Sequence, residues 1–254
     1  MANQNLLSVG LDAALAGSNE ILAIYDSTTF EIETKGDSSP LTLADKKAHQ
    51  AIVAILKSSE LPILSEEGKS VPYEVRKNWP LFWMVDPLDG TKEFIKRNGE
   101  FTVNIALIEN QKPVLGVVAV PVKGEVYYGT KGKAFKRVNG EVKELNRSGH
   151  VDMSKPGIRV VASRSHLNEE TRTFIDSLND PQLVTKGSSL KFLMLADDQA
   201  DIYPRFAPTM EWDTAAAHAV VSQLGIKVFR KGSSHELIYN KENLINPGFI
   251  AYRR

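Results

Sequence analysis

The stretch that decides the fold of this chain reads Trp83-Met84-Val85-Asp86-Pro87-Leu88-Asp89-Gly90-Thr91-Lys92-Glu93-Phe94. The apolar run 81–85 is typical of a buried strand, and a proline interrupts both a helix and a strand ladder. We therefore expect Asp86 at the end of that strand and Asp89 in the turn that follows. Two carboxylates with the free carbonyl of Leu88 between them suit Mg²⁺, which prefers oxygen ligands.

The same turn also offers a site for an anion. The backbone amides of Gly90 and Thr91 open the next segment, and amides at the start of a helix or turn bind anions. A metal ion and a phosphate could then share one loop. The alternative is an ordinary surface turn, because Asp-Pro and Asp-Gly are common turn pairs. Spacing alone does not choose between the two interpretations.

A resemblance to a known family begins at this motif. Asp86-Pro87-Leu88-Asp89-Gly90-Thr91 resembles the D-P-(I/L)-D-G-T signature of the inositol monophosphatase superfamily of Mg²⁺-dependent, lithium-sensitive phosphomonoesterases. Residues 92–95 and 98–107 resemble its 3′(2′),5′-bisphosphate nucleotidase branch, the bacterial proteins of sulfate assimilation. Further family blocks follow in order over nearly the whole chain. The resemblance implies a five-layered αβαβα sandwich with the active site between two halves.

The composition is that of an ordinary globular protein. The 254 residues are 42% hydrophobic, which is enough for a substantial core. Lys plus Arg and Asp plus Glu both number 31, so no overall field attracts nucleic acid, and phosphate binding must come from local arrangement. The absence of cysteine excludes disulfides, thiol nucleophiles and thiolate metal sites.

The expected location is the cytoplasm. Residues 1–5 lack the basic start of a signal peptide, and we expect no apolar run that approaches the length needed to span a bilayer. Peripheral association with the inner membrane stays open, as does the choice between monomer and dimer.

Two halves of different character are predicted. Residues 1–145 form an α+β half that carries the DPLDGT motif, and residues 146–254 form an α/β half that completes the metal site and binds the nucleotide. Hydrophobic periodicity predicts helices over 7–25, 43–57, 169–178, 190–196 and 214–223. It predicts strands over 62–64, 81–85, 102–108, 114–120, 125–128, 158–162, 183–185, 202–203 and 226–229.

Two carboxylates outside the motif are candidate metal ligands. Glu66 and Glu67 follow a strand-like run, and a solvated acidic loop is the alternative; in the family the first Glu of this block binds metal, which points to Glu66. Asp213 stands where a helix N-cap residue belongs, and a cap is compatible with metal binding. Its surroundings match the family block W-D-x-A-A, which carries the last metal ligand, although Ala217 replaces a glycine common there.

The residues 41–45 resemble the T-x-x-D element of the family. The alternative is a capping box, in which Thr42 caps the helix and Asp45 occupies its third position. In the mechanism that the resemblance implies, Asp45 and Thr91 orient the attacking water.

Substrate recognition is expected from the second half. Three blocks, 163–166, 187–192 and 203–206, place a His, a Lys and two Arg near the ends of predicted elements, which is the chemistry that holds a second phosphate. They resemble blocks that contact the nucleotide in bisphosphate nucleotidases. The resemblance therefore implies that the non-scissile phosphate or ribose meets Ser188, Lys191 and Arg205, and that the nucleoside meets His166.

The sequence as a whole predicts a phosphatase that removes the 3′-phosphate of adenosine 3′,5′-bisphosphate and releases AMP, with the sulfated analogue left open as a second substrate. No G-x-G-x-x-G, Walker loop or G-x-S-x-G elbow is present. The alternatives are an inositol or sugar phosphatase of the same superfamily and a non-catalytic metal or phosphate-binding module. Two or three Mg²⁺ ions are expected on Glu66, Asp86, the Leu88 carbonyl, Asp89 and Asp213, which with Gly90 and Thr91 would also face the substrate.

Overall fold

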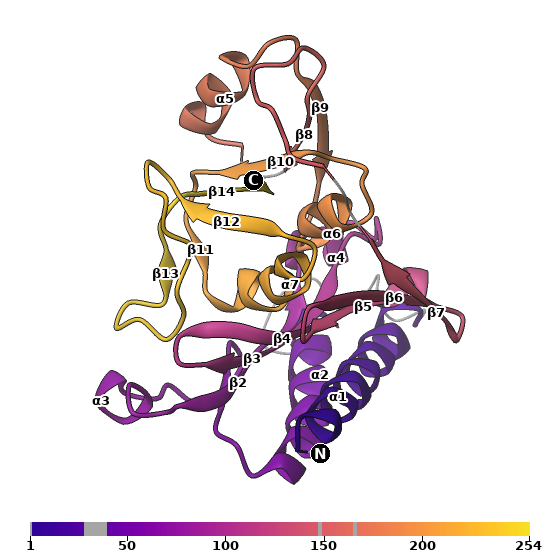
Figure 1. The fold of residues 1–254 in the computed structure, drawn as a ribbon. Helices are drawn as coiled ribbons and strands as arrows, with labels where there is room; N and C mark the ends of the chain where they lie inside the picture. The colour runs from indigo at the N-terminus through magenta and orange to yellow at the C-terminus, as the bar shows by residue number, and fades with distance from the viewer. Residues whose placement is uncertain (1, 28–39, 147–148, 165–166) are drawn as a thin grey trace.

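A computed structural model describes residues 2–27, 40–146, 149–164 and 167–254. The chain forms five layers, which are two N-terminal helices, a seven-stranded sheet, a central helical layer, a five-stranded sheet and an outer helix (Figure 1). The predicted αβαβα sandwich is confirmed. The division into halves at residues 145 and 146 remains our proposal.

The first sheet follows the chain in simple order from β1 to β7. Its first two strands are parallel and every later neighbour is antiparallel. Sequence periodicity missed its last two strands. The final one was missed because four of its five residues are exposed and carry no apolar alternation. The strands are β1 Ile63–Ser65, β2 Leu81–Asp89, β3 Thr102–Glu109, β4 Lys112–Val120, β5 Glu125–Thr130, β6 Lys133–Val138 and β7 Glu141–Leu145.

Strand β2 is apolar throughout because helices cover both faces of the sheet. Phe82 and Met84 belong to the core beneath the central helices, whereas Trp83 and Val85 belong to the core beneath the N-terminal helices. Successive side chains of a strand point to opposite faces, so each of these residues is buried. This double burial holds the end of β2, and with it the motif, in the middle of the molecule.

The N-terminal helices are α1 Ala2–Tyr25 and α2 Pro40–Leu56. Within α1, Leu6–Tyr25 is long and apolar enough to cross a membrane by length and composition, so the expectation that no apolar run approaches this length was wrong. In the structure α1 packs against α2, β3 and β4. Its apolar face is thus part of the core, as Ala13, Ala14 and Ile21 show by their complete burial.

The central layer consists of α6 Leu190–Ala196 and α7 Trp212–Ser222. Helix α7 lies against β4 and β3 on one side and against β12 (Ile226–Arg230) on the other. The close approach depends on small residues: a Cβ added to Gly116 of β4 would lie 2.1 Å from the carbonyl oxygen of Ala216. This packing brings the start of α7 to the end of β2.

The second sheet has the order β12-β14-β10-β8-β9, with α5 Glu169–Asp176 on its outer face. The C-terminal strand β14 was not predicted; it pairs antiparallel with both of its neighbours. The strands of this sheet are β8 Arg159–Ser163, β9 Gln182–Lys186, β10 Ile202–Arg205, β12 Ile226–Arg230 and β14 Phe249–Arg253. The remaining elements are α3 Tyr73–Arg76, α4 Thr91–Ile95, the 3₁₀ turns Lys57–Ser59 and Pro121–Lys123, and a ribbon of β11 Thr209–Met210 with β13 Ile245–Asn246.

Candidate active site

The motif lies on an irregular strand end rather than in a turn. Strand β2 continues through Pro87, with Asp86 paired to Asn104 and Asp89 paired to Thr102. Three residue steps on β2 thus face two on β3, which is the count of a β-bulge. The expected strand end at Asp86 was wrong, because a proline is accepted within a bulge, where the regular ladder is interrupted. The bulge leaves both carboxylates at the edge of the core.

Three carboxylates from distant parts of the chain meet at this point. One oxygen each of Glu66, Asp86 and Asp213 lie within 4.8 Å of one another. Glu66 follows β1, and its N–H donates to the Val85 carbonyl at 3.1 Å, so the parallel pairing of β1 with β2 places it beside Asp86. Asp213 comes from the first turn of α7.

The electrostatics of this group suit a cation. Burial, reinforced by the neighbouring carboxylates, raises the pKa of Asp86 well above its usual range and raises the pKa of Asp213 to about 7. Burial also raises the pKa of Glu66. Crowded carboxylates resist ionisation unless positive charge offsets their repulsion. An all-oxygen donor set of this kind fits a hard divalent cation.

Asp89 is held by the loop before α6. Its Oδ2 accepts hydrogen bonds from the Ser188 hydroxyl at 2.7 Å, the Ser189 amide at 2.7 Å and the Ser189 hydroxyl at 3.1 Å. The role of Ser189 was missed in the sequence, where only its place in a tandem serine pair before a helix marks it. Asp89 lies outside the three-carboxylate group, and its role as a metal ligand remains a prediction.

The two capping interpretations were wrong. Glu211 is the N-cap residue of α7, and Asp213 instead accepts a hydrogen bond from the Met210 amide at 2.8 Å. Helix α2 already includes Pro40, so Thr42 lies inside it. Both helices begin earlier than their polar residues suggest. Asp213 therefore lies in the first turn of α7, whereas Asp45 lies beyond the first turn of α2.

Asp45 belongs electrostatically to the same acidic group. Burial, with the nearby charges of Glu67 and Glu66, raises its pKa to about 8, and its own charge raises the pKa of Asp86. The pairing of Asp45 with Thr91 in orienting a water remains a prediction.

An open cavity joins the motif to the second half of the molecule. Lys191 and Arg205 line it and are only 6% and 8% exposed, which is unusual for cationic side chains. Burial lowers the pKa of Lys191 to about 8, and its Nζ donates to the Ser188 carbonyl. The predicted residue His166 lies outside the described residues. The predicted residues that line this cavity are Asp89, Gly90, Thr91, Ser188, Lys191, Arg205 and Asp213.

The cavity therefore has an acidic end and a cationic end. Asp213 lies at its acidic end, where the carboxylates could hold divalent cations, and buried Lys191 and Arg205 line the same space. Such an arrangement suits a ligand with two anionic groups, one bound through metal and one bound directly by Lys and Arg.

Comparison with known proteins agrees with this chemistry. The model of the inositol monophosphatase family matches residues 2–250. The 3′(2′),5′-bisphosphate nucleotidase CysQ of Salmonella typhimurium is 47% identical over 233 residues, which are 90% of this chain and 92% of that protein. The protein of the same name from Haemophilus influenzae is 33% identical, over 98% of this chain and 93% of that protein.

A solved structure shows the same likeness in three dimensions. The crystal structure of CysQ from Bacteroides thetaiotaomicron, described as a bacterial member of the inositol monophosphatase family, superimposes with a TM-score of 0.91 at 46% identity. The match covers 98% of this chain and 97% of that one. An inositol monophosphatase from Zymomonas mobilis, at 24% identity and a TM-score of 0.77, shares the fold. By its sequence over nearly its full length, this chain belongs to the inositol monophosphatase family.

Proposed function

We propose that this protein is a Mg²⁺-dependent 3′(2′),5′-bisphosphate nucleotidase that hydrolyses adenosine 3′,5′-bisphosphate to AMP and phosphate. The observation that carries the proposal is one cavity that holds both Asp213, a member of the carboxylate group, and the buried cations Lys191 and Arg205. A substrate with a single phosphate has no need of the second, metal-free anion site. The relatives named above bear the same activity in their names.

The acidic end fits two or three Mg²⁺ ions. Its ligands would be Glu66, Asp86 and Asp213, which lie together, with Asp89 and the Leu88 carbonyl from the same bulge. When bound, the metal lowers the pKa of a water molecule and offsets charge on the attacking and leaving oxygens. Without it, the carboxylates would repel a phosphomonoester dianion.

The remaining motif residues would act on the substrate and the water. The amides of Gly90 and Thr91, which line the cavity, face the scissile phosphate, and the carboxylate of Asp45 with the Thr91 hydroxyl orients the attacking water.

The second phosphate would lie at the cationic end. Lys191 is buried, and its ammonium stands 5.5 Å from the centre of the Tyr203 ring, which leaves little room for water around it. With Arg205 and the hydroxyl of Ser188 it offers charge-assisted hydrogen bonds to the 5′-phosphate or the ribose. His166 is proposed to contact the nucleoside.

Phosphate release tests the proposal directly. The purified protein is assayed with Mg²⁺ on adenosine 3′,5′-bisphosphate, its sulfated analogue, inositol 1-phosphate and fructose 1,6-bisphosphate, with a chelator as control. We expect Mg²⁺-dependent release with strong preference for the nucleotides. Preference for inositol or sugar phosphate would keep the metal site and overturn the assignment of the cationic end. Lack of release from all of them would favour a binding module.

A further inference from the structure

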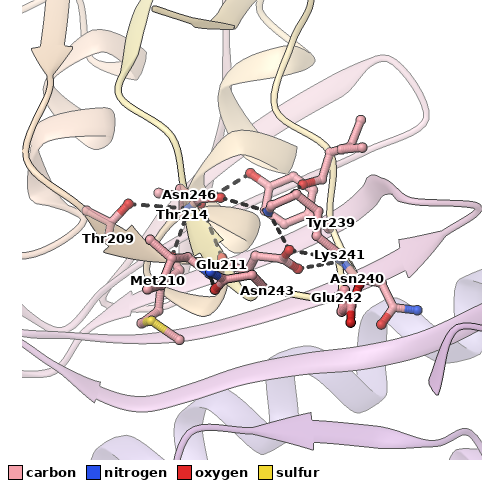
Figure 2. A network of polar contacts seen from close by, with 12 residues as sticks. Thr209, Met210, Glu211, Thr214, Tyr239, Asn240, Lys241, Glu242, Asn243 and Asn246 are labelled. Atoms are coloured by element: carbon pink, nitrogen blue, oxygen red, sulfur yellow. Dashed lines mark hydrogen bonds and ion pairs between the residues drawn. The ribbon is translucent and has the colours of Figure 1, made fainter. Parts of the chain in front are cut away.

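A segment of the second half, residues 239–246, runs alongside the turn that carries Asp213; we name it the 239–246 strap. Figure 2 shows Lys241 and Asn246 of the strap beside Glu211 and Thr214 at the start of α7. The strap leads into β13, whose residues Ile245 and Asn246 pair with Met210 and Thr209 of β11. It thus lies directly beside Thr209 and Met210, which come shortly before Asp213.

The first link between the strap and this turn is the side chain of Glu211, which is completely buried. It accepts hydrogen bonds from the backbone amides of Asn240 and Lys241 and from the Lys241 ammonium (Figure 2). The Glu211 amide in turn donates to the Leu244 carbonyl at 2.9 Å. A buried carboxylate with these partners is fixed in position, because every alternative would leave a charge unpaired.

The second link is Asn246, which is 2% exposed. Its side-chain amide donates to the Met210 carbonyl at 2.9 Å and to the Thr214 hydroxyl at 3.0 Å. The amide of the same Met210 donates to the Asp213 carboxylate. Asn246 therefore fixes Met210, and Met210 in turn fixes the carboxylate of Asp213, the candidate metal ligand.

The strap is itself anchored to the first half of the molecule. Buried Arg76 donates to the Asn240 side chain and to the carbonyls of Lys241 and Glu242, and the Asn240 side-chain amide donates to the Arg76 carbonyl. The Tyr239 amide donates to the Gln111 carbonyl at 3.0 Å, in the turn between β3 and β4. The strap thus connects the turn before Asp213 to the first sheet, whose strands position Glu66 and Asp86.

We propose that Glu211 and Asn246 are positioning residues for the metal centre: through the strap they fix Asp213 relative to Glu66 and Asp86. The inference rests on the proposed function, since it concerns metal binding at the same site. Mg²⁺ demands near-ideal octahedral geometry, so a carboxylate that arrives from the other half of the molecule must be held in register. Groups that hold a ligand typically contribute about 10–100-fold to metal affinity.

Two variants test the two links without touching a ligand. Lys241→Met removes the cation that neutralises Glu211, and Asn246→Ala releases the Met210 carbonyl. Matched controls outside the strap are Lys227→Met, which breaks the ion pair with Glu236, and Asn19→Ala, at an exposed position of α1. The metal alone, Mn²⁺, is titrated into each folded protein and followed by electron paramagnetic resonance.

We expect Lys241→Met and Asn246→Ala to weaken Mn²⁺ binding by about 10-fold or more, and the controls to remain within twofold of the unaltered protein. The Mg²⁺ concentration for half-maximal turnover should rise similarly, while KM for the nucleotide at saturating Mg²⁺ stays unchanged. A Lys241→Arg variant should restore affinity. The Lys241 side chain is partly exposed, so Lys241→Met should fold. If Asn246→Ala does not fold, Lys241→Met alone tests the inference.

The outcomes separate this inference from the proposed function. Unchanged Mn²⁺ affinity in Lys241→Met, with an active unaltered protein, would overturn the positioning role and leave the nucleotidase proposal in place. An unaltered protein that binds Mn²⁺ but does not hydrolyse the nucleotide would overturn the function, and the affinities of the variants would still test the strap. Equal loss of affinity in the Lys227→Met control would show a general effect of destabilisation and count against the inference.

Discussion

Asp86 and Lys191 are both buried ionisable residues at the candidate active site, and the pKa of each is shifted from its ordinary value. Burial and neighbouring carboxylates raise the pKa of Asp86, while burial lowers the pKa of Lys191 to about 8. Ionisable groups with strongly shifted pKa values cluster at functional sites. Each of them gives a prediction at the scale of the single residue.

Replacement of Asp86 by Asn should remove turnover and leave the fold intact. A central metal ligand is lost, so we expect activity to fall by more than about 100-fold, since even outer residues of metal sites cost about 10–100-fold. The variant also removes one charge from a crowded acidic group, so its melting temperature in chelator should equal or exceed that of the unaltered protein. Thermal melts and phosphate release check both, with Asp12→Asn on an exposed face of α1 as control. Retention of most of the activity would contradict the metal assignment.

Lys191→Met keeps the aliphatic stem and removes the charge. Loss of a hydrogen bond from a charged donor costs about 1.5–3 kcal/mol, which corresponds to a rise of roughly 10–100-fold in KM for adenosine 3′,5′-bisphosphate. A simple phosphomonoester should show little change, because it has no second phosphate. Steady-state kinetics on both substrates measure the difference, with exposed Lys96→Ala as control. Equal effects on both substrates would remove Lys191 from the non-scissile phosphate.

At the scale of elements, the contact between β4 and α7 decides where Asp213 lies. Helix α7 is rich in alanine, and Ala215, Ala216 and Ala217 are almost completely buried against the sheets. Gly116 permits the approach, since any side chain there would collide with the backbone of α7. Small residues on both elements thus set the distance between the motif on β2 and the start of α7.

Gly116→Ala should therefore weaken both the fold and the site. Overpacking of this kind costs about 1–3 kcal/mol of unfolding free energy, and displacement of α7 should lower metal affinity as well. Urea unfolding and Mn²⁺ titration check the two effects. Gly10→Ala is the control: its added Cβ would lie 3.4 Å from Val117 in ordinary contact, and alanine in a helix interior stabilises by up to about 1 kcal/mol. A Gly116→Ala protein as stable as the control would show that α7 does not depend on this approach.

Most of the elements that the sequence predicted are buried and have apolar periodicity, which the exposed strand β7 lacks. Strands β2 to β5 and helix α7 are buried and were expected within a few residues of their observed bounds. Strand β7 was not predicted because it is an exposed, charged edge strand. The bulge after Asp86 was not predicted because a proline ordinarily signals the end of a strand. The exposed edge gains its strand structure from pairing with β6, which no local pattern records.

At the scale of the whole molecule, folding brings negative charges together that are far apart in the unfolded chain. The pKa of Asp45 is about 8 and that of Asp213 about 7 in the folded protein, whereas an unfolded Asp titrates near about 4. Between those values the folded state binds more protons than the unfolded state. The unfolding free energy of the metal-free protein must then fall as pH rises through this window.

We accordingly expect the metal-free protein to be more stable at pH 5 than at pH 8, and Mg²⁺ to remove most of that difference. One pKa unit of net shift is about 1.4 kcal/mol, which corresponds to roughly 3–6 °C in the melting temperature of a protein of this size. Calorimetry at several pH values, with chelator and with Mg²⁺, measures the effect. A melting temperature in chelator that rises from pH 5 to pH 8 would contradict the crowding of these carboxylates.

The sequence by itself determined the DPLDGT motif, the buried strand before it, the alternation of most helices and strands, and the types of residue that could bind metal and phosphate. These features depend on neighbours within a few positions, so they can be seen in the order of residues. Tertiary structure alone decided that Glu66, Asp86 and Asp213 meet, that Ser189 holds Asp89, and that Glu211 and Asn246 lie behind the site. Those contacts join segments that are far apart in the sequence, and the pairing of β1 with β2 and the packing of α6 and α7 between the two sheets bring them together.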